Sequence, residues 1–126
     1  MFLESKDKCM ALHNELGRTG EQMAAEFLEG SGFTILFRNW RHSRYEIDII
    51  AVKNSVLHFI EVKTRKSTQY GLPEADVDRK KLNSMINASE GFLSKFPRWT
   101  RIQYDVLSIS ITDNNANYFL IEDVYL

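Results

Sequence analysis

The feature that most constrains the fold is residues 45–65, where two apolar runs of β-strand character flank a short polar turn. Each run carries charged residues that a plain core strand would lack. Residues two apart point to the same face of a strand, so Glu46 and Asp48 share a face, and so do Glu61 and Lys63. If the runs pair as a hairpin, one sheet face gathers three carboxylates and one ammonium. A site that binds a hard cation beside a phosphate needs that combination.

Length and composition limit the class of protein. A length of 126 residues favours one domain, expected at residues 13–126 behind a weakly patterned lead-in at residues 1–12. Hydrophobic residues make up 44% of the chain, enough for a core. No apolar run approaches the ~20 residues of a membrane helix, and the charged N-terminus lacks a signal-peptide core. The single cysteine, Cys9, allows no internal disulfide, so we expect a cytoplasmic protein with no membrane partner.

The distribution of charge is more informative than the net charge of −1, which argues against a uniformly basic nucleic-acid binder. Residues 38–81 contain ten Lys and Arg against six Asp and Glu, a local charge of +4 that leaves −5 for the rest of the chain. This clustering has two readings: solvated charges grouped by chance, or a local patch that faces phosphates.

Apolar periodicity and turn residues predict an α/β fold. Helices are expected at residues 13–30 and 74–96, and strands at residues 33–41, 45–52, 56–64, 101–111 and 117–121. The order α-β-β-β-α-β-β combines a meander with a helical crossover, which implies a mixed central sheet. Both faces of the strands are apolar away from the acids, so helices should flank the sheet on both sides. Ile47, Ile49 and Ala51 are expected on one face.

The first helix holds three residues that bear on the site. Asn14 suits its N-cap. Gly20 lies in its interior, where Gly costs roughly 1 kcal/mol relative to Ala, and this indicates close approach of the helix to a sheet or a ligand. Glu21 borders the apolar stripe, and it is either simply solvated or leans over the sheet edge beside the carboxylates of the two strands.

Asp48, Glu61 and Lys63 match, in type and spacing, the parts that metal-assisted phosphodiester cleavage needs. The two carboxylates would hold Mg²⁺ (or Mn²⁺), with the backbone carbonyl of Val62 as a further oxygen ligand. Lys63 would stabilise charge that builds on the phosphate. An E-x-K pattern alone is weak evidence, because alternating charges are common on exposed strand faces.

Several other polar and aromatic residues have open roles. The three histidines show no metal-ligand spacing, and His58 is expected as a core or edge histidine. Trp40, Tyr45 and Tyr70 either stack on unpaired bases or simply pack. Asp105 is expected to be a structural partner for a helix or an arginine.

A series of motifs supports a resemblance to a known family. The motifs are L-G-R-T-G-E at 16–21, N-W-R at 39–41, E-I-D-I-I at 46–50, F-I-E-V-K-T-R at 59–65, G-L-P at 71–73, Lys80 and Y-D-V at 104–106. In this order they resemble the YraN family of small bacterial proteins, over roughly residues 14–109. That family is similar to the restriction-endonuclease-like superfamily, and most of all to the archaeal Holliday-junction resolvases.

The resemblance implies roles for residues at matching positions. Asp48 and Glu61 would be metal ligands, Lys63 the superfamily lysine and Glu21 a helix-borne acid. Glu46, Arg65 and Lys80 match further polar positions of the family pattern. One departure is Tyr45, where the family commonly has Gly before its first acid; a tyrosine there narrows the approach to the site or stacks on a base.

We therefore expect a restriction-endonuclease-like core that cleaves DNA phosphodiester bonds with Mg²⁺ or Mn²⁺, at branched or damaged DNA. Asp48 and Glu61 are the expected metal ligands, and Lys63, Glu21 and Glu46 the expected catalytic residues. The residues expected to hold DNA phosphates are Arg38, Arg41, Arg44, Arg65, Arg79, Lys80 and Lys81. A homodimer is expected, because resolving a four-way junction takes two cuts. The alternatives are a non-catalytic nucleic-acid-binding module with the same fold, and a protein-interaction scaffold.

Overall fold

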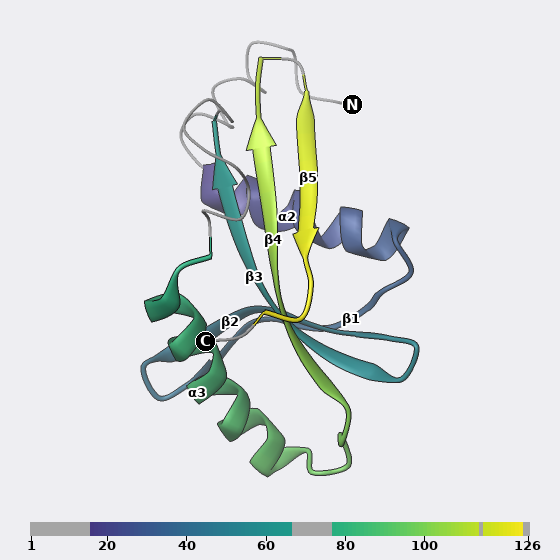
Figure 1. Ribbon diagram of the computed structural model, residues 1–126, viewed down its shortest axis with the longest axis vertical. Coiled ribbons are helices and arrows are strands. Elements are labelled where there is room, and N and C mark those ends of the chain that lie inside the picture. Colours follow the sequence, from purple (N-terminus) through teal and green to yellow (C-terminus); the bar gives the residue numbers. More distant parts are fainter. Residues whose placement is uncertain (1–15, 67–76, 114, 125–126) are drawn as a thin grey trace.

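The computed structural model describes residues 16–66, 77–113 and 115–124, and these form two helices and five strands (Figure 1). Their bounds are α2 (Leu16–Gly30), β1 (Thr34–His42), β2 (Tyr45–Lys53), β3 (Val56–Arg65), α3 (Arg79–Lys95), β4 (Ile102–Ile111) and β5 (Ala116–Ile121). The expected order of elements is confirmed, and each strand begins and ends within one residue of its predicted position. Of the helices in this described part, none combines the length and apolarity that a bilayer span requires.

The strands form one mixed sheet in the order β1-β2-β3-β4-β5. The β1–β2, β2–β3 and β4–β5 pairs are antiparallel, while β3 and β4 are parallel. The chain passes through α3 between β3 and β4, and a parallel pair needs a crossover of that kind. Figure 1 shows the second half of β3 continuing beside β4 and β5, away from the β1–β2 hairpin.

Two apolar clusters cover the two faces of the sheet, as the predicted helices on both sides require. Alternate strand residues enter different clusters because successive side chains point to opposite faces. The α2 cluster contains the buried residues Ala24, Leu28, Phe33, Ile49, Ala51, Ile60, Leu107 and Ile109. The α3 cluster contains Ile47, Ile50, Leu57, Phe59, Leu82, Met85, Ala88 and Phe92.

One face assignment from the sequence is wrong. Ile49 and Ala51 pack in the α2 cluster as expected, but Ile47 packs in the α3 cluster. The β2–β3 ladder runs from Lys53↔Val56 only as far as Ile49↔Ile60. Strict alternation of side chains depends on a regular strand. Ile47 still pairs with Trp40 on β1, but it lies beyond the last β2–β3 pair, and Asn39 on β1, next to Trp40, has a left-handed backbone with φ of 54°. This end of β2 therefore departs from the geometry that the alternation rule assumes.

The start of α3 also differs from the prediction. The helix was expected from residue 74, but it begins at Arg79, and residues 77 and 78 are not helical. Asp78 is the N-cap: its carboxylate accepts hydrogen bonds from the backbone N–H groups of Lys80 and Lys81, at 2.9 and 3.5 Å. These bonds satisfy N–H groups that the first helical turn leaves unpaired. Outside the described residues lie the other positions singled out above: residues 1–12, Asn14, Tyr70, residues 71–73 and residues 74–76.

Gly20 marks the close approach of α2 to the sheet that the sequence predicts. A Cβ atom added at Gly20 would overlap the side chain of Thr64 on β3. Gly30, at the end of the same helix, has no neighbouring atom within 4 Å of such a Cβ. The absence of a side chain at Gly20 is therefore what lets α2 lie against β3.

We predict that Gly20→Ala lowers the free energy of unfolding by about 1–3 kcal/mol, the usual cost of overpacking a tight contact. Gly30→Ala is the matched control and should leave stability unchanged, or raise it by up to about 1 kcal/mol through better helix propensity. Urea denaturation followed by circular dichroism measures both. Equal unfolding midpoints for the two variants would show that α2 does not depend on close approach at Gly20.

Candidate functional site

A cavity of about 220 Å³ lies where the β1–β2 turn, β2, β3 and α3 meet. It is lined by Arg44, Glu46, Asp48, Glu61, Lys81 and Ser84. Three of these side chains are acidic and two are basic. The cavity therefore contains acids from both strands of the predicted hairpin, together with cations from a turn and a helix.

Asp48 and Glu61 come together through the register of β2 against β3. The last pair in the ladder is Ile49↔Ile60, so Asp48 and Glu61 are the next residue on each strand. There the backbone pairing stops, and the backbone N–H of Val62 instead donates to Oδ2 of Asp48 at 2.8 Å. This bond holds the Asp48 carboxylate against β3. The sequence-based expectation that both acids face one site is consistent with this geometry.

Burial shifts the ionisation of both carboxyl groups upward. The pKa of Glu61 rises from 4.5 to about 7, first because burial penalises the charged form and then because the Asp48 carboxylate repels it. Burial also raises the pKa of Asp48, against the opposing effect of the Val62 hydrogen bond. The fold thus holds two acids where their negative charges are unfavourable, and a bound cation would relieve that cost.

The ammonium group nearest to Glu61 in the described part of the chain comes from α3. Lys81 Nζ lies 3.9 Å from Glu61 Oε2. Lys63 shares a strand face with Glu61, and its charge lowers the pKa of that carboxyl, but it does not line the cavity. The sequence assigned the lysine beside the acids to Lys63 and gave Lys81 only a phosphate-binding role. Lys81 is therefore the lysine that lines the cavity, and the catalytic role expected of Lys63 stays a prediction.

Glu46 and Glu21 lie at the margin of the pair. Glu46 lines the cavity and forms a 3.5 Å ion pair with Arg41, its cross-strand neighbour on β1. Glu21, on α2, accepts a hydrogen bond from the Asn39 side chain at 3.2 Å. The charges of both glutamates add to the upward shift in the pKa of Asp48. Both acids therefore act on Asp48 through their charge, and the catalytic roles expected of Glu21 and Glu46 stay predictions.

The seven basic residues predicted to hold phosphates are spread over several elements. Arg44 and Lys81 line the cavity, and the Arg44 guanidinium lies over the Tyr45 ring at 5.2 Å. Arg79 and Lys80 are exposed in the first turn of α3, and Arg41 pairs with Glu46 as described. Arg38 donates to Gln22 on α2 at 3.0 Å, and Arg65 donates to Ser110 on β4 at 3.4 Å. The structure thus brings two of the seven into direct contact with the cavity.

The donor set fits one kind of metal site. Within residues 16–66, 77–113 and 115–124, no three His, Cys, Asp or Glu side chains converge closely enough to form a metal cluster. An all-protein cage is therefore not available in this region. Mg²⁺ and similar hard cations, however, are commonly held by one or two carboxylates and complete their shell with waters and substrate phosphates. Asp48 and Glu61 fit that second arrangement.

Comparison with known protein families gives a match to the uncharacterised protein family UPF0102 over residues 20–109. The chain belongs to the UPF0102 family. A UPF0102 protein of Bacteroides thetaiotaomicron is 38% identical over 109 residues, covering 86% of this chain and 88% of the relative. One of Flavobacterium johnsoniae is 38% identical over 117 residues, with 90% and 93% covered. One of Dictyoglomus thermophilum is 40% identical over 101 residues, with 79% and 86% covered.

These matches confirm the YraN-type resemblance at the level of the family. The UPF0102 match includes both strands of the hairpin and the whole of α3, and so every residue that lines the acidic cavity. The acidic cavity therefore lies wholly within the matched residues.

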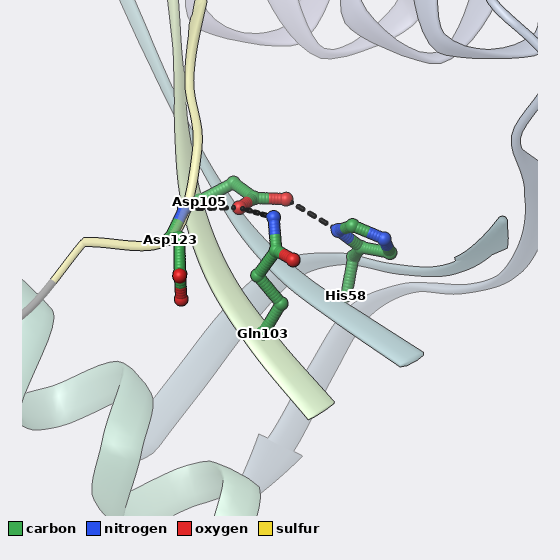
Figure 2. A network of polar contacts seen from close by, with 4 residues as sticks. All are labelled: His58, Gln103, Asp105 and Asp123. Atoms are coloured by element: carbon green, nitrogen blue, oxygen red, sulfur yellow. Dashed lines mark hydrogen bonds and ion pairs between the residues drawn. The ribbon is translucent and has the colours of Figure 1, made fainter. Parts of the chain in front are cut away.

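Sequence reasoning missed two features of this UPF0102 chain. Ser84 lines the cavity from α3, one turn after Lys81, and no motif marked it. His58 is buried, as expected for a core histidine, but its Nδ1 lies 2.6 Å from Oδ2 of Asp105 (Figure 2). The expected helix or arginine partner of Asp105 was wrong: its partners are His58, the Gln103 side chain and the backbone N–H of Asp123. Trp40 and Tyr45 pack against the α3 cluster.

The raised pKa of Glu61 predicts how stability depends on pH. The folded state binds the Glu61 proton more tightly than the unfolded state does. The contribution of this proton to the free energy of unfolding is therefore fully present below pH 4.5 and is lost as pH rises through about 7. Glu61→Gln removes the titration. Relative to the parent protein, the free energy of unfolding of the variant should therefore increase as pH rises from 4.5 to about 7. The increase should reach up to about 3 kcal/mol, the equivalent of the shift in the pKa of Glu61.

Urea denaturation from pH 4.5 to pH 8.5 measures this difference. Glu90→Gln, a change at an exposed α3 position that does not line the cavity, is the matched control and should keep the pH profile of the parent protein. A constant difference between Glu61→Gln and the parent protein across this range would contradict the buried, acid-paired placement of Glu61.

Proposed function

We propose that this UPF0102 chain is a metal-dependent endonuclease that hydrolyses DNA phosphodiester bonds. The observation that carries the proposal is the cavity in which the Asp48 and Glu61 carboxylates lie on adjacent strands beside the basic groups of Arg44 and Lys81. Carboxyl groups whose pKa values are raised by burial and by neighbouring charges cluster at functional sites. Phosphodiester hydrolysis needs carboxylates that hold a cation and positively charged side chains that bind the phosphate oxygens. The cavity supplies two of each.

In this proposal Asp48 and Glu61 hold Mg²⁺ (or Mn²⁺). Such a cation, when bound, polarises a phosphoryl oxygen and lowers the pKa of a coordinated water. The Val62 N–H holds the Asp48 carboxylate through Oδ2, and Oδ1 would be the oxygen offered to the cation. The exposed side of the cavity admits the scissile phosphate, and waters or phosphate oxygens supply the remaining ligands.

The other groups of the cavity act on the substrate and on the proton. Lys81 and Arg44 bind the phosphoryl oxygens and offset their negative charge as it grows in the transition state. Glu46, held by Arg41, accepts a hydrogen bond from the attacking water. Glu21 remains a supporting acid that acts on Asp48 through its charge. Lys63, which both the strand spacing and the family pattern indicate, is the alternative to Lys81 as the lysine that stabilises the phosphate.

The finer parts of the proposal rest on the family resemblance. The order α-β-β-β-α-β-β and the mixed sheet agree with a restriction-endonuclease-like core, in which a β-hairpin carries the acids. Similarity to archaeal Holliday-junction resolvases supports branched DNA as the substrate and a homodimer as the active form. Exposed Arg79 and Lys80 extend the basic surface beyond the cavity and support binding of a long polyanion.

One observation favours the second candidate, a non-catalytic nucleic-acid-binding module. Lys81 already supplies a positive charge beside Glu61, so part of the acidic charge is balanced without a metal. A module of this kind would bind DNA in a salt-sensitive way and yield no metal-dependent product. The two candidates are therefore separated by turnover and not by affinity.

A cleavage assay on duplex, flap and four-way-junction DNA, with Mg²⁺ or Mn²⁺ against a chelator, tests the proposal. We predict metal-dependent cleavage that Asp48→Asn reduces on the order of 100-fold or more, the scale at which loss of a key transition-state group is felt. DNA binding by Asp48→Asn should persist, because the change removes negative charge. Salt-sensitive binding with no product on any substrate would support the binding module instead.

The same assay separates the candidate lysines. If Lys81 stabilises the phosphate, Lys81→Met should reduce turnover far more than Lys63→Met or Lys80→Met. Lys80→Met is the matched control, since Lys80 is the exposed preceding residue of the same helical turn and does not line the cavity. The opposite order, with Lys63→Met the most damaging, would restore the role that the family pattern gives to Lys63.

A further inference from the structure

A second cavity lies at the other end of the β2–β3 hairpin. It has a volume of about 330 Å³, and the residues that matter in its lining are Lys53, His58, Arg101, Gln103 and Glu122. Two of these side chains are cationic and one is anionic, the reverse of the balance in the acidic cavity. Its size falls near the lower end of the range of about 300–1,000 Å³ for small-molecule sites.

His58 is the buried polar group of this cavity. Its side chain is only 6% exposed, and Nδ1 lies 2.6 Å from Oδ2 of Asp105, whose side chain is fully buried. The other Asp105 oxygen accepts from Gln103 Nε2 and from the backbone N–H of Asp123, each at 2.9 Å. A carboxylate held by donors in this way can only accept from the imidazole, so Nδ1 carries the proton. Figure 2 shows the second ring nitrogen directed away from Asp105.

The second ring nitrogen of His58 has no protein partner in the described part of the chain. No hydrogen bond joins Nε2 to another described residue, and no buried side-chain nitrogen or oxygen there is left without a partner. Nε2 is therefore open to the cavity that His58 lines. An orientation fixed through Nδ1 is the usual way in which a protein presents Nε2 to a ligand.

Two cationic side chains, Lys53 and Arg101, line the same cavity as His58. The Lys53 ammonium lies 5.1 Å from the centroid of the Phe33 ring, and the same ring packs edge-on against His58 at 4.9 Å. Arg101, exposed just before β4, lines the cavity with them, and Glu122 is the opposing charge. The lining thus offers an ammonium, a guanidinium and an imidazole nitrogen, with an amide group from Gln103.

We propose that this cavity binds a phosphate group, either inorganic phosphate or a terminal phosphate monoester. A phosphate presents several oxygens in a compact tetrahedron, which suits convergent donors from Lys53, Arg101 and His58. For Nε2 to donate to the anion, the ring must take up a second proton, from solvent or from the P–OH group of the bound phosphate, and the Asp105 carboxylate then balances the added positive charge. The aspartate that fixes the ring therefore also prepares it to bind an anion.

This site is separate from the proposed nuclease site. Lys53 lies five residues from Asp48 along β2, roughly 17 Å at the rise of a β-strand. His58 contacts Phe33 of the α2 cluster, whereas Glu61 pairs with Lys81 of α3 on the other face. The inference does not rest on the proposed function. Phosphate binding here and DNA cleavage at Asp48 can each fail while the other holds.

Titration of the full chain with inorganic phosphate, followed by ¹⁵N NMR of the histidine rings and by calorimetry, tests the proposal. Phosphate should shift the Nε2 resonance of His58. Arg101→Gln and Lys53→Gln should each weaken binding by about tenfold, the loss expected when one charge-assisted hydrogen bond is removed. Neither position is fully buried, so folding should survive. Arg98→Gln, an exposed arginine outside the cavity, is the matched control and should bind as the parent protein does.

Two dinucleotides that differ only in a 5′-phosphate distinguish the sources of the phosphate. Tighter binding of the phosphorylated dinucleotide than of inorganic phosphate identifies a nucleic-acid end or a nucleotide as the ligand. If the phosphorylated dinucleotide and inorganic phosphate bind equally well, the ligand is free phosphate. Both results support the phosphate site. The proposal is overturned if neither ligand shifts the His58 resonance, or if Arg98→Gln weakens binding as much as Arg101→Gln does.

Discussion

The hydrogen bond from the Val62 N–H to the Asp48 carboxylate is the interaction on which the acidic cavity depends. Backbone N–H groups inside a fold must find an acceptor, and here a side chain supplies it where the β2–β3 ladder ends. The bond holds Asp48 against β3 next to Glu61, and it partly offsets the cost of burying the Asp48 charge. The end of a ladder thus becomes a place where two acids face an open cavity.

Much of this arrangement could be predicted from local rules. The alternation of residues 45–65 predicts the hairpin and the shared face of its acids, and the interior Gly20 predicts the contact of α2 with the sheet. The assignment of Ile47 failed because the alternation rule assumes a regular strand, whereas here β2 has left its ladder with β3 and β1 has an irregular backbone at Asn39. The position of Lys81 beside Glu61 could not be predicted, because it depends on where a helix lies relative to a strand 20 residues earlier.

The pairing of His58 with Asp105 shows a second limit of sequence reasoning. The residues are 47 positions apart and come together only through the register of the parallel β3–β4 pair, in which His58 lies opposite Gln103 and Ile60 opposite Asp105. No periodicity in the sequence encodes that register. The result is a sheet with a polar centre at each end of its hairpin, one acidic and one basic. The gathering of three acids in one cavity also argues against the scaffold alternative, which requires dispersed acids.

Binding of Mn²⁺ to the full chain without nucleic acid, measured at pH 8 by electron paramagnetic resonance, tests the central claim most directly. The claim is that Asp48 and Glu61 form one cation site. We expect a single site that Asp48→Asn weakens by about tenfold or more, on the scale at which metal sites respond to altered ligands. Glu90→Gln, at an exposed α3 position, should leave it unchanged. Equal Mn²⁺ affinity in Asp48→Asn and the parent protein would contradict the account.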